Sequence, residues 1–238
     1  GDMVDGGKAK IKSLLYPMMA WADRHFGFLE HCWSMKSGKQ IEEYFGTIGD
    51  DADRYIAGVL EAIQFESFLE LGCGCGNRLF NIAKLYPQIK ITGIDVSSRA
   101  IKIGNDFFKS SGIENVEFVQ KRIESLEDFP SDSFDVIFSR ATLIYISPKK
   151  IVPVLKEIVR VAKKHVILME MQGEDLKNDP RGTGIFCPPG NWKRDYVRLL
   201  GDLGIEKECI RVEEVSTSVW SPGGGGATLI MFEKKKGF

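Results

Sequence analysis

The sequence is poor in cysteine and has no long apolar run. Its five cysteines are an odd number at irregular spacing, which does not suit a disulfide framework and favours a reducing compartment. No stretch approaches the roughly 20 apolar residues of a membrane span, and the opening residues 1–3 begin no apolar stretch of the signal-peptide type. The sequence therefore predicts a cytoplasmic protein without a membrane partner.

An excess of positive charge is lacking as well. Lysine and arginine number 32 and aspartate and glutamate 33, so the net charge is −1. Because proteins that track nucleic-acid phosphates usually carry a strong basic excess, we expect no nucleic-acid partner. Low-complexity sequence is confined to the four glycines 223–226, and no repeat of fixed period is present. These features are typical of a soluble globular domain.

The pattern of apolar residues changes near residue 60. In residues 1–60 they recur at helical spacing, as at Ile11, Leu14, Leu15 and Met18, and predict two or three helices without a strand. Residues 61–238 predict alternating strands and helices. Strands are expected at 68–71, 89–94, 116–119, 134–138 and 165–169, and helices at 77–86, 97–109, 147–162 and 191–203.

Two further strands are expected at 210–220 and 227–232, joined by a turn at 221–226. The sequence thus predicts an α/β fold with a three-layer, Rossmann-like sheet. The sheet is expected to be mostly parallel and to end in an antiparallel edge pair. Residues 1–60 form a helical N-terminal cover in this prediction, and Pro153 is expected to bend the helix at 147–162.

One glycine-rich stretch joins the first predicted strand to a helix, where an open α/β sheet binds its ligand. It runs from Glu70 to Asn77 as Glu-Leu-Gly-Cys-Gly-Cys-Gly-Asn. Its spacing differs from the dinucleotide pattern G-x-G-x-x-G, because Asn77 stands where the third glycine is required. Glu70 would repel a pyrophosphate but suits a ligand with an ammonium group. S-adenosylmethionine has such a group, a cationic sulfur and no phosphate.

Two more blocks follow at regular intervals. Asp95 ends the second predicted strand, 23 residues after Gly72, and its carboxylate can accept hydrogen bonds from both hydroxyls of a ribose. The fourth predicted strand ends at Arg140, on the same edge of the sheet.

These three blocks, in this order, resemble the class I S-adenosylmethionine-dependent methyltransferases from residue 67 to about residue 170. The resemblance implies that Asp95 and Val96 hold the ribose and that Arg140 borders the transferred methyl group. The adenine contact is expected from backbone groups or Glu124, because Arg122 replaces a family aspartate and cannot accept a hydrogen bond. The cofactor-binding residues implied in this way are Glu70, Gly72, Cys73, Gly74, Gly76, Asp95, Val96, Arg122, Ile123, Glu124 and Arg140.

Several residues outside these blocks have two interpretations. His25 and His31 lie either on an amphipathic helix that packs on the domain or on a lid that supplies a general base. Tyr145 is the third candidate for a base. Cys73 and Cys75 form a C-x-C pair, but without a second cluster at ligand spacing they predict no metal site. The candidates for substrate contacts are Tyr16, Trp21, Tyr145, Arg181 and Trp192, with solvated surface as the alternative for Arg181 and for Arg194.

The expected reaction is in-line transfer of the methyl group to an oxygen, nitrogen or carbon of a small-molecule acceptor. The segment 139–146 lacks the Asn/Asp-Pro-Pro-aromatic sequence of members that methylate amides or adenine amines, which argues against a DNA or glutamine target. A catalytically silent cofactor-binding regulator, an NAD-dependent oxidoreductase and a polyamine synthase remain as alternatives. The acceptor, and whether the protein is a monomer or a homodimer, stay open at this point.

Overall fold

The computed structural model describes residues 2–173, 179, 181–188, 190–219 and 226–235. Within these residues seven strands form one sheet, in the order β3-β2-β1-β4-β5-β9-β8. In chain order they are β1 (Ser67–Leu71), β2 (Lys90–Asp95), β3 (Val116–Gln120), β4 (Phe134–Arg140), β5 (Ala162–Glu170), β8 (Arg211–Val215) and β9 (Ala227–Glu233). A separate antiparallel ribbon pairs β6 (Ile185–Cys187) with β7 (Asn191–Lys193).

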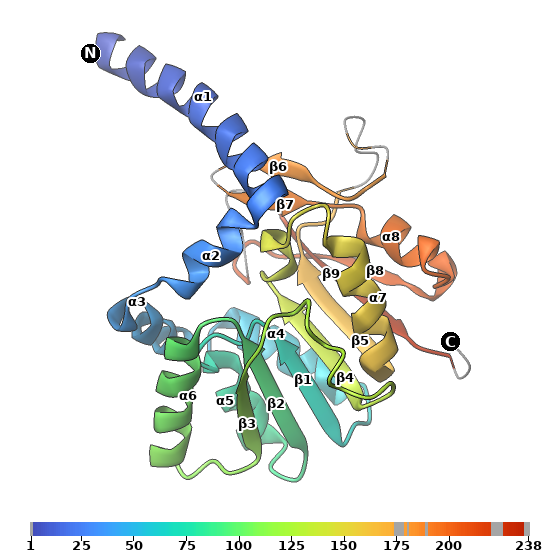
Figure 1. Cartoon of the computed structure of the whole chain (residues 1–238). Helices are drawn as coiled ribbons and strands as arrows, with labels where there is room; N and C mark the ends of the chain where they lie inside the picture. The colour runs from blue at the N-terminus through green and yellow to red at the C-terminus, as the bar shows by residue number, and fades with distance from the viewer. Residues whose placement is uncertain (1, 174–178, 180, 189, 220–225, 236–238) are drawn as a thin grey trace.

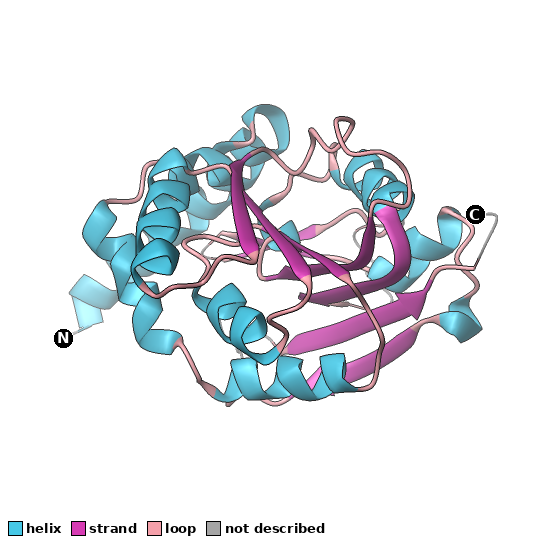
Figure 2. Ribbon diagram, turned by 90° about the horizontal axis from the view of Figure 1, so that it is seen from below, coloured by secondary structure: helices cyan, strands magenta, loops and turns pink. Residues whose placement is uncertain are grey.

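Helices cover both faces of this sheet (Figures 1 and 2). The longer helices are α1 (Asp2–Phe26), α2 (Phe28–Ser34), α3 (Gly38–Glu42), α4 (Asp51–Glu61), α5 (Asn77–Leu85), α6 (Ser98–Ser110), α7 (Ile151–Val161) and α8 (Tyr196–Asp202). Short 3-10 helices are η1 (Glu43–Thr47), η2 (Leu143–Tyr145) and η3 (Lys207–Cys209).

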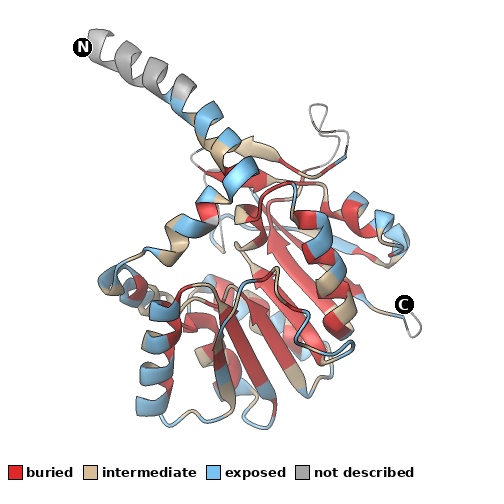
Figure 3. Cartoon of the chain, viewed as in Figure 1, coloured by how far each residue is buried: buried red, intermediate tan, exposed pale blue. Residues whose placement is uncertain are grey.

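The sheet is buried on both faces because successive side chains of a strand point in opposite directions. On β1, Leu69 joins a core that includes residues of α7 and α8. Its neighbour Phe68 joins a second core with residues of α4, α5 and α6. The inner strands β1, β2, β4, β5 and β9 are accordingly buried along most of their length, whereas the edge strands β3 and β8 are mostly half-buried or exposed (Figure 3). The three-layer α/β architecture predicted from the sequence is confirmed.

Strands β1 to β5 are mutually parallel, whereas β9 is antiparallel to both of its neighbours. The expectation of a mostly parallel sheet with a reversed C-terminal strand is confirmed. The reversed strand does not lie at the edge, however, because β8 occupies that position and β9 lies between β5 and β8.

The N-terminal segment is helical, as predicted, and no strand occurs within residues 2–61. Helix α1 projects away from the body of the domain and ends close to β7 (Figure 1). Among the described residues, no helix is long and apolar enough to cross a membrane.

Three element predictions are corrected by the structure. The helix expected from residue 191 begins only at Tyr196, capped by Asp195, because residues 191–193 pair with β6. The helix expected from residue 147 begins at Ile151, so Pro153 lies in its first turn, where a missing backbone donor is tolerated. The strand expected at 210–220 ends at Val215, and part of the predicted turn lies outside the described residues.

Candidate functional site

A pocket lies at the carboxyl ends of the central strands, under part of the N-terminal segment. Four loops, one after each of β1, β2, β3 and β4, provide most of its wall. From these loops and α5 come Glu70, Gly72, Cys73, Gly74, Cys75, Asn77, Arg78, Asp95, Val96, Ser97, Lys121, Ile123, Glu124, Arg140, Ala141, Thr142, Tyr145 and Ile146. The N-terminal segment adds Trp33, Lys36, Ile41 and Tyr44, and α6 adds Ala100.

The glycine loop owes its shape to three residues with positive φ, at 69° for Gly72, 58° for Gly74 and 80° for Gly76. A side chain at Gly72 would clash with Thr142, and one at Gly76 would clash with Phe118. Space beside Gly74 is open, and Gly74 lines the pocket. Gly72 and Gly76 therefore allow close packing, whereas Gly74 leaves room for a ligand next to the backbone.

Asp95 is held in a fixed orientation by the backbone. Its Oδ2 accepts a hydrogen bond from the amide of Gly74 at 2.9 Å, and its Oδ1 accepts one from the amide of Ser97 at 2.8 Å. Burial raises the pKa of Asp95 above its usual value, although these amide hydrogen bonds act in the opposite direction. Each carboxylate oxygen has a second lone pair, so the residue can still accept two hydroxyl donors from the pocket.

Glu70, the penultimate residue of β1, has only 4% of its surface exposed. Its Oε2 has no hydrogen-bond partner among the described residues, although the residue lines the pocket. Burial raises the pKa of Glu70 to about 8, and the nearby charge of Arg78 only partly offsets this effect. A buried oxygen without a donor is unfavourable, so a cationic group bound beside it would be stabilised.

Ionic and polar contacts join this loop to the N-terminal segment. Arg78 donates to Asp53 of α4 at 2.9 Å, and Asp53 accepts from the amide of Gly49 at 2.7 Å. The amide nitrogen of the Asn77 side chain donates to the hydroxyl of Thr47 at 2.7 Å. Residues 47–53 are therefore bound to the start of α5, the helix that follows the glycine loop.

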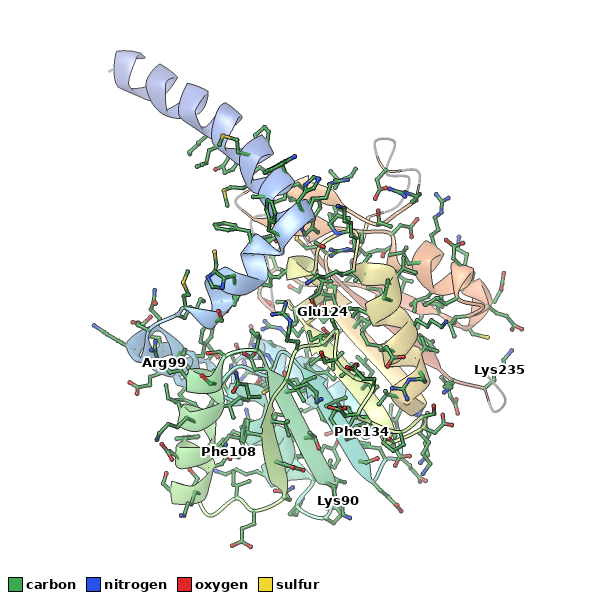
Figure 4. The ribbon with its side chains drawn as sticks, viewed as in Figure 1. Lys90, Arg99, Phe108, Glu124, Phe134 and Lys235 are labelled. Atoms are coloured by element: carbon green, nitrogen blue, oxygen red, sulfur yellow. The ribbon has the colours of Figure 1, made fainter. Side chains whose placement is uncertain are left out.

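Beyond β3 the pocket is bounded by Ile123 and Glu124. The Oε1 of Glu124 accepts a hydrogen bond from Lys150 at 2.6 Å, while its Oε2 is buried without a partner among the described residues. Burial opposes ionisation, but the hydrogen bonds from Lys150 and a backbone amide outweigh it and lower the pKa of Glu124. Glu124 is therefore an ionised acceptor at this end of the pocket (Figure 4). Arg122 is exposed and does not line it.

The loop after β4 is fixed from within the protein by a residue that the sequence analysis missed. Glu170 is fully buried at the end of β5 and accepts hydrogen bonds from the amides of Thr142, Leu143 and Ile144 at 3.1–3.3 Å. Ala141 has a positive φ of 53°, a strained value for a residue with a side chain. The one available signal was an acidic residue closing an otherwise apolar strand.

Aromatic side chains line the pocket near Tyr145. The rings of Trp33 and Tyr145 lie 5.1 Å apart between centroids. The Nζ of Lys36 lies 3.4 Å from the centroid of the Trp33 ring and donates to the hydroxyl of Tyr44 at 2.7 Å. Burial raises the pKa of Tyr145 to about 12. At neutral pH this phenol therefore remains protonated and can donate a hydrogen bond, but it is a poor base.

The structure brings together most of the predicted cofactor residues and few of the predicted substrate residues. Those that line the pocket are Glu70, Gly72, Cys73, Gly74, Asp95, Val96, Ile123, Glu124, Arg140 and Tyr145. Those that do not are Gly76, Arg122, His25, His31, Tyr16, Trp21, Arg181 and Trp192.

Several of these exceptions have a physical reason. Gly76 caps α5 and packs on Phe118. His25 and His31 are exposed on α1 and α2, and the Nδ1 of His25 donates within its own helix to the carbonyl of Trp21 at 2.8 Å. Trp192 is fully buried, and its indole nitrogen donates to Asp23 at 2.6 Å.

The two cysteines of the glycine loop are buried thiols. Burial raises the pKa of Cys75 to about 11 and that of Cys73 well above its usual value, so both are protonated at neutral pH. Among the described residues, no group of three or more histidine, cysteine or acidic side chains is arranged to hold a metal ion.

Comparison with known proteins identifies the family of this chain. Residues 65–185, just over half of the chain, match the model of a methyltransferase domain. The chain belongs to this family. It is a class I S-adenosylmethionine-dependent methyltransferase domain, and S-adenosylmethionine is its cofactor.

This methyltransferase domain is similar to malonyl-[acyl-carrier protein] O-methyltransferase of Paenibacillus sp. (strain JDR-2), with 34% identity over 154 residues. That match covers 64% of this chain and 51% of the relative, so the chain spans about half the length of that curated relative. Two solved structures share the fold. The [4+2]-cyclase SpnF has a TM-score of 0.62 at 21% identity, over 78% of this chain and 81% of its own.

The second structure is magnesium protoporphyrin IX methyltransferase from Synechocystis PCC 6803 with bound S-adenosylmethionine. It has a TM-score of 0.57 at 14% identity and covers 94% of this chain and 97% of its own. At these identities the two structures establish the fold alone.

Proposed function

We propose that this domain transfers the methyl group of S-adenosylmethionine to an oxygen, nitrogen or carbon atom of a small-molecule acceptor. The observation that carries the proposal is the order of three carboxylates along the sheet. Glu124 follows β3, Asp95 ends β2 and Glu70 lies one residue before the end of β1, and these strands are adjacent in the order β3-β2-β1. Because neighbouring strands lie about 4.8 Å apart, the three acceptors span roughly two strand spacings.

This order fits the three parts of the cofactor. Glu124, with an unpartnered buried oxygen, suits the amino group of adenine. Asp95, with one free lone pair on each oxygen, suits the two hydroxyls of a ribose. Glu70, whose Oε2 lacks a donor, suits the ammonium group of the methionine part. Gly74 lies between Glu70 and Asp95 in the sequence, and the open space beside it admits the ligand close to the backbone.

Bound in this pocket, S-adenosylmethionine supplies a methyl group attached to a cationic sulfur. The chain's own residues position the acceptor and exclude water. Arg140 ends β4, the strand beside β1, and Thr142 and Tyr145 lie in the loop after it, which Glu170 fixes. Tyr145 donates a hydrogen bond to the acceptor in this proposal. Most of the rate acceleration then comes from the fixed placement of the two reactants.

The N-terminal segment closes the acceptor side of the pocket in this proposal. Trp33, Lys36 and Tyr44 line it, and Ile41 packs against Cys75 of the glycine loop and Ala100 of α6. Residues 1–60 thus act as a cover whose inner part, from Trp33 onward, contacts the site, and residues 61–238 form the methyltransferase domain proper. Its aromatic surface favours an acceptor with an apolar or ring-containing portion.

The test is a calorimetric titration with S-adenosylmethionine, S-adenosylhomocysteine and NAD, followed by an assay for S-adenosylhomocysteine release with carboxylic acids, phenols and amines. We expect both adenosyl ligands to bind and NAD not to bind. Asp95→Ala should weaken binding at least about 10-fold, which corresponds to about 1.4 kcal/mol. The control is Asp106→Ala, which removes an exposed aspartate paired with Lys102 on α6.

Binding of NAD alone would contradict the proposal. Binding of both adenosyl ligands without turnover of any acceptor class would instead favour a catalytically silent regulator.

A further inference from the structure

A second cleft lies outside the cofactor pocket, where α1, the start of α7 and α8 meet residues 181–183. Its volume is about 560 Å³. The floor is apolar, with Pro148, Val152, Leu199 and Leu203. Helices α7 and α8 are neighbours in the fold (Figure 1), so this apolar floor adjoins the surface where the two helices pack together.

Four cations border this cleft, and each comes from a different part of the chain. Arg24 ends α1, Lys149 precedes α7, Arg181 precedes β6 and Arg198 lies on α8. Asp202 is the only carboxylate among the described lining residues. None of the four cations forms an ion pair with a described residue. Four cations and one carboxylate around the same cleft give it a net positive charge, which attracts an anion.

Backbone contacts bring the turn that carries Arg181 next to the helix that carries Arg198. Gly182 has a φ of 71°, and its carbonyl accepts from the amide of Asp195, the cap of α8. A Cβ atom built on Gly182 would lie 3.6 Å from the Cδ of Arg198, so the stem of Arg198 passes over this turn. The backbone next to Arg181 therefore lies against the side chain of Arg198. The guanidinium of Arg24 lies 5.2 Å from the centroid of the Trp192 ring, and this contact positions the side chain.

We propose that this cleft binds the phosphate group of a phosphorylated small molecule. Three guanidinium groups and one ammonium group match the charge and the planar, forked geometry with which proteins bind phosphate oxygens. The apolar floor gives the rest of such a ligand a surface to pack against. A long nucleic acid does not suit this site, because the chain as a whole is not basic.

The cleft is separate from the cofactor pocket but close to it in the chain. Tyr145 and Ile146 line the pocket, and Pro148 and Lys149 line the cleft. Binding in the cleft does not depend on S-adenosylmethionine, so it can be tested even if the proposed methyl transfer fails.

The experiment is a calorimetric titration of the full chain with inorganic pyrophosphate at constant ionic strength, with and without S-adenosylhomocysteine. We expect binding to the wild type in both conditions. Arg181→Gln and Arg198→Gln should each lower the affinity about tenfold, the effect of losing one hydrogen bond to a charged group. Asp202→Asn should raise the affinity, because it removes the carboxylate from the cleft. All three side chains are at the surface of the cleft, so thermal unfolding should show an intact fold.

The control is Arg211→Gln, which removes an exposed arginine of β8 that pairs with Glu213 outside the cleft. It should leave pyrophosphate binding unchanged. Pyrophosphate that fails to bind, or that binds the wild type, Arg181→Gln and Arg211→Gln equally, would overturn the proposal. So would binding of a DNA oligonucleotide without binding of pyrophosphate.

Discussion

Glu170 and Arg194 both hold the loop after β4. Glu170 binds the backbone amides of the loop, and Arg194 binds its backbone carbonyls. Glu170 accepts from the amides of residues 142–144, and Arg194 donates to the carbonyl of Leu143 at 2.7 Å and to that of Ile146. Both side chains are fully buried. Since this loop carries Tyr145, the two residues fix the acceptor side of the pocket without facing it.

Removal of the acidic partner should destabilise the domain strongly. In Glu170→Ala, three buried amides and the hydroxyl of Ser139 lose their acceptor. We expect the free energy of unfolding to fall by about 3 kcal/mol or more, because each buried donor left without a partner costs about 1–3 kcal/mol. Urea denaturation measures this change. Glu157→Ala, in a partly exposed pair with Arg160, should change it by less than about 1 kcal/mol. Equal effects would mean that the loop is held by other contacts.

The glycine loop allows a comparison between two glycines with the same backbone angle. Gly72 and Gly112 have φ values of 69° and 68°, but only Gly72 has a side chain, Thr142, in the position of an added Cβ. Gly112→Ala should cost about 1–2 kcal/mol through left-handed backbone strain alone. Gly72→Ala should cost more, and it alone should weaken binding of S-adenosylhomocysteine. Unfolding and titration of both variants test this. Equal losses of stability would show that Thr142 moves aside freely.

The parts of the fold and site that could be predicted are those encoded in short stretches. Parallel strands buried on both faces appear as continuous apolar runs, which made β1, β2 and β4 recognisable. Glu70 was identified because it precedes the glycine loop, and Asp95 because it ends the second strand.

Other residues act across long stretches of the chain and leave no local pattern. Glu170 contacts a loop 26–28 residues before it in sequence, and Arg194 contacts the same loop from 48–51 residues away. Residues 191–193 looked helical because their apolar spacing is compatible with either structure, and only the pairing with β6 decides. The histidines of α1 and α2 suggested a base from their residue type alone, whereas the helices place them away from the pocket.

Helix α1, the outer part of the N-terminal segment, should loosen from the domain without loss of cofactor binding. Asp23 is fully buried and accepts hydrogen bonds from the amide of Leu29 and the indole of Trp192. Asp23→Ala leaves both donors unpaired, so α1 should loosen from β7, with a loss of about 1–3 kcal/mol. Hydrogen exchange should increase in residues 15–29. Binding of S-adenosylhomocysteine should not change, because residues 41–53 contact the glycine loop independently.

A matched control is Asp51→Ala, which removes an exposed aspartate paired with Arg54 on α4. It should not increase exchange in residues 15–29. Loss of cofactor binding in Asp23→Ala would show instead that the cover moves as one unit.

Binding of the cofactor should release a proton from Glu70. Because burial raises the pKa of this carboxyl group to about 8, it is mostly protonated at pH 7 in the ligand-free domain. A ligand ammonium group favours the ionised form, so binding of S-adenosylhomocysteine at pH 7 should release close to one proton. Affinity should therefore rise as the pH increases from 6 toward 8. Titrations in two buffers of different ionisation enthalpy measure the number of protons.

The same shift sets the pH dependence of stability. The folded-state pKa lies above the ordinary value of 4.5, so the contribution of protonated Glu70 is full in acid and is lost as the pH rises through about 8. Glu70→Gln keeps a neutral group of the same shape. It should remove both the loss of stability at rising pH and the release of a proton on ligand binding. Wild-type binding without proton release would mean that Arg78 and Arg140 already keep Glu70 ionised. In that case the unpartnered oxygen would be a permanent anion, and the selectivity for an ammonium ligand would not depend on pH.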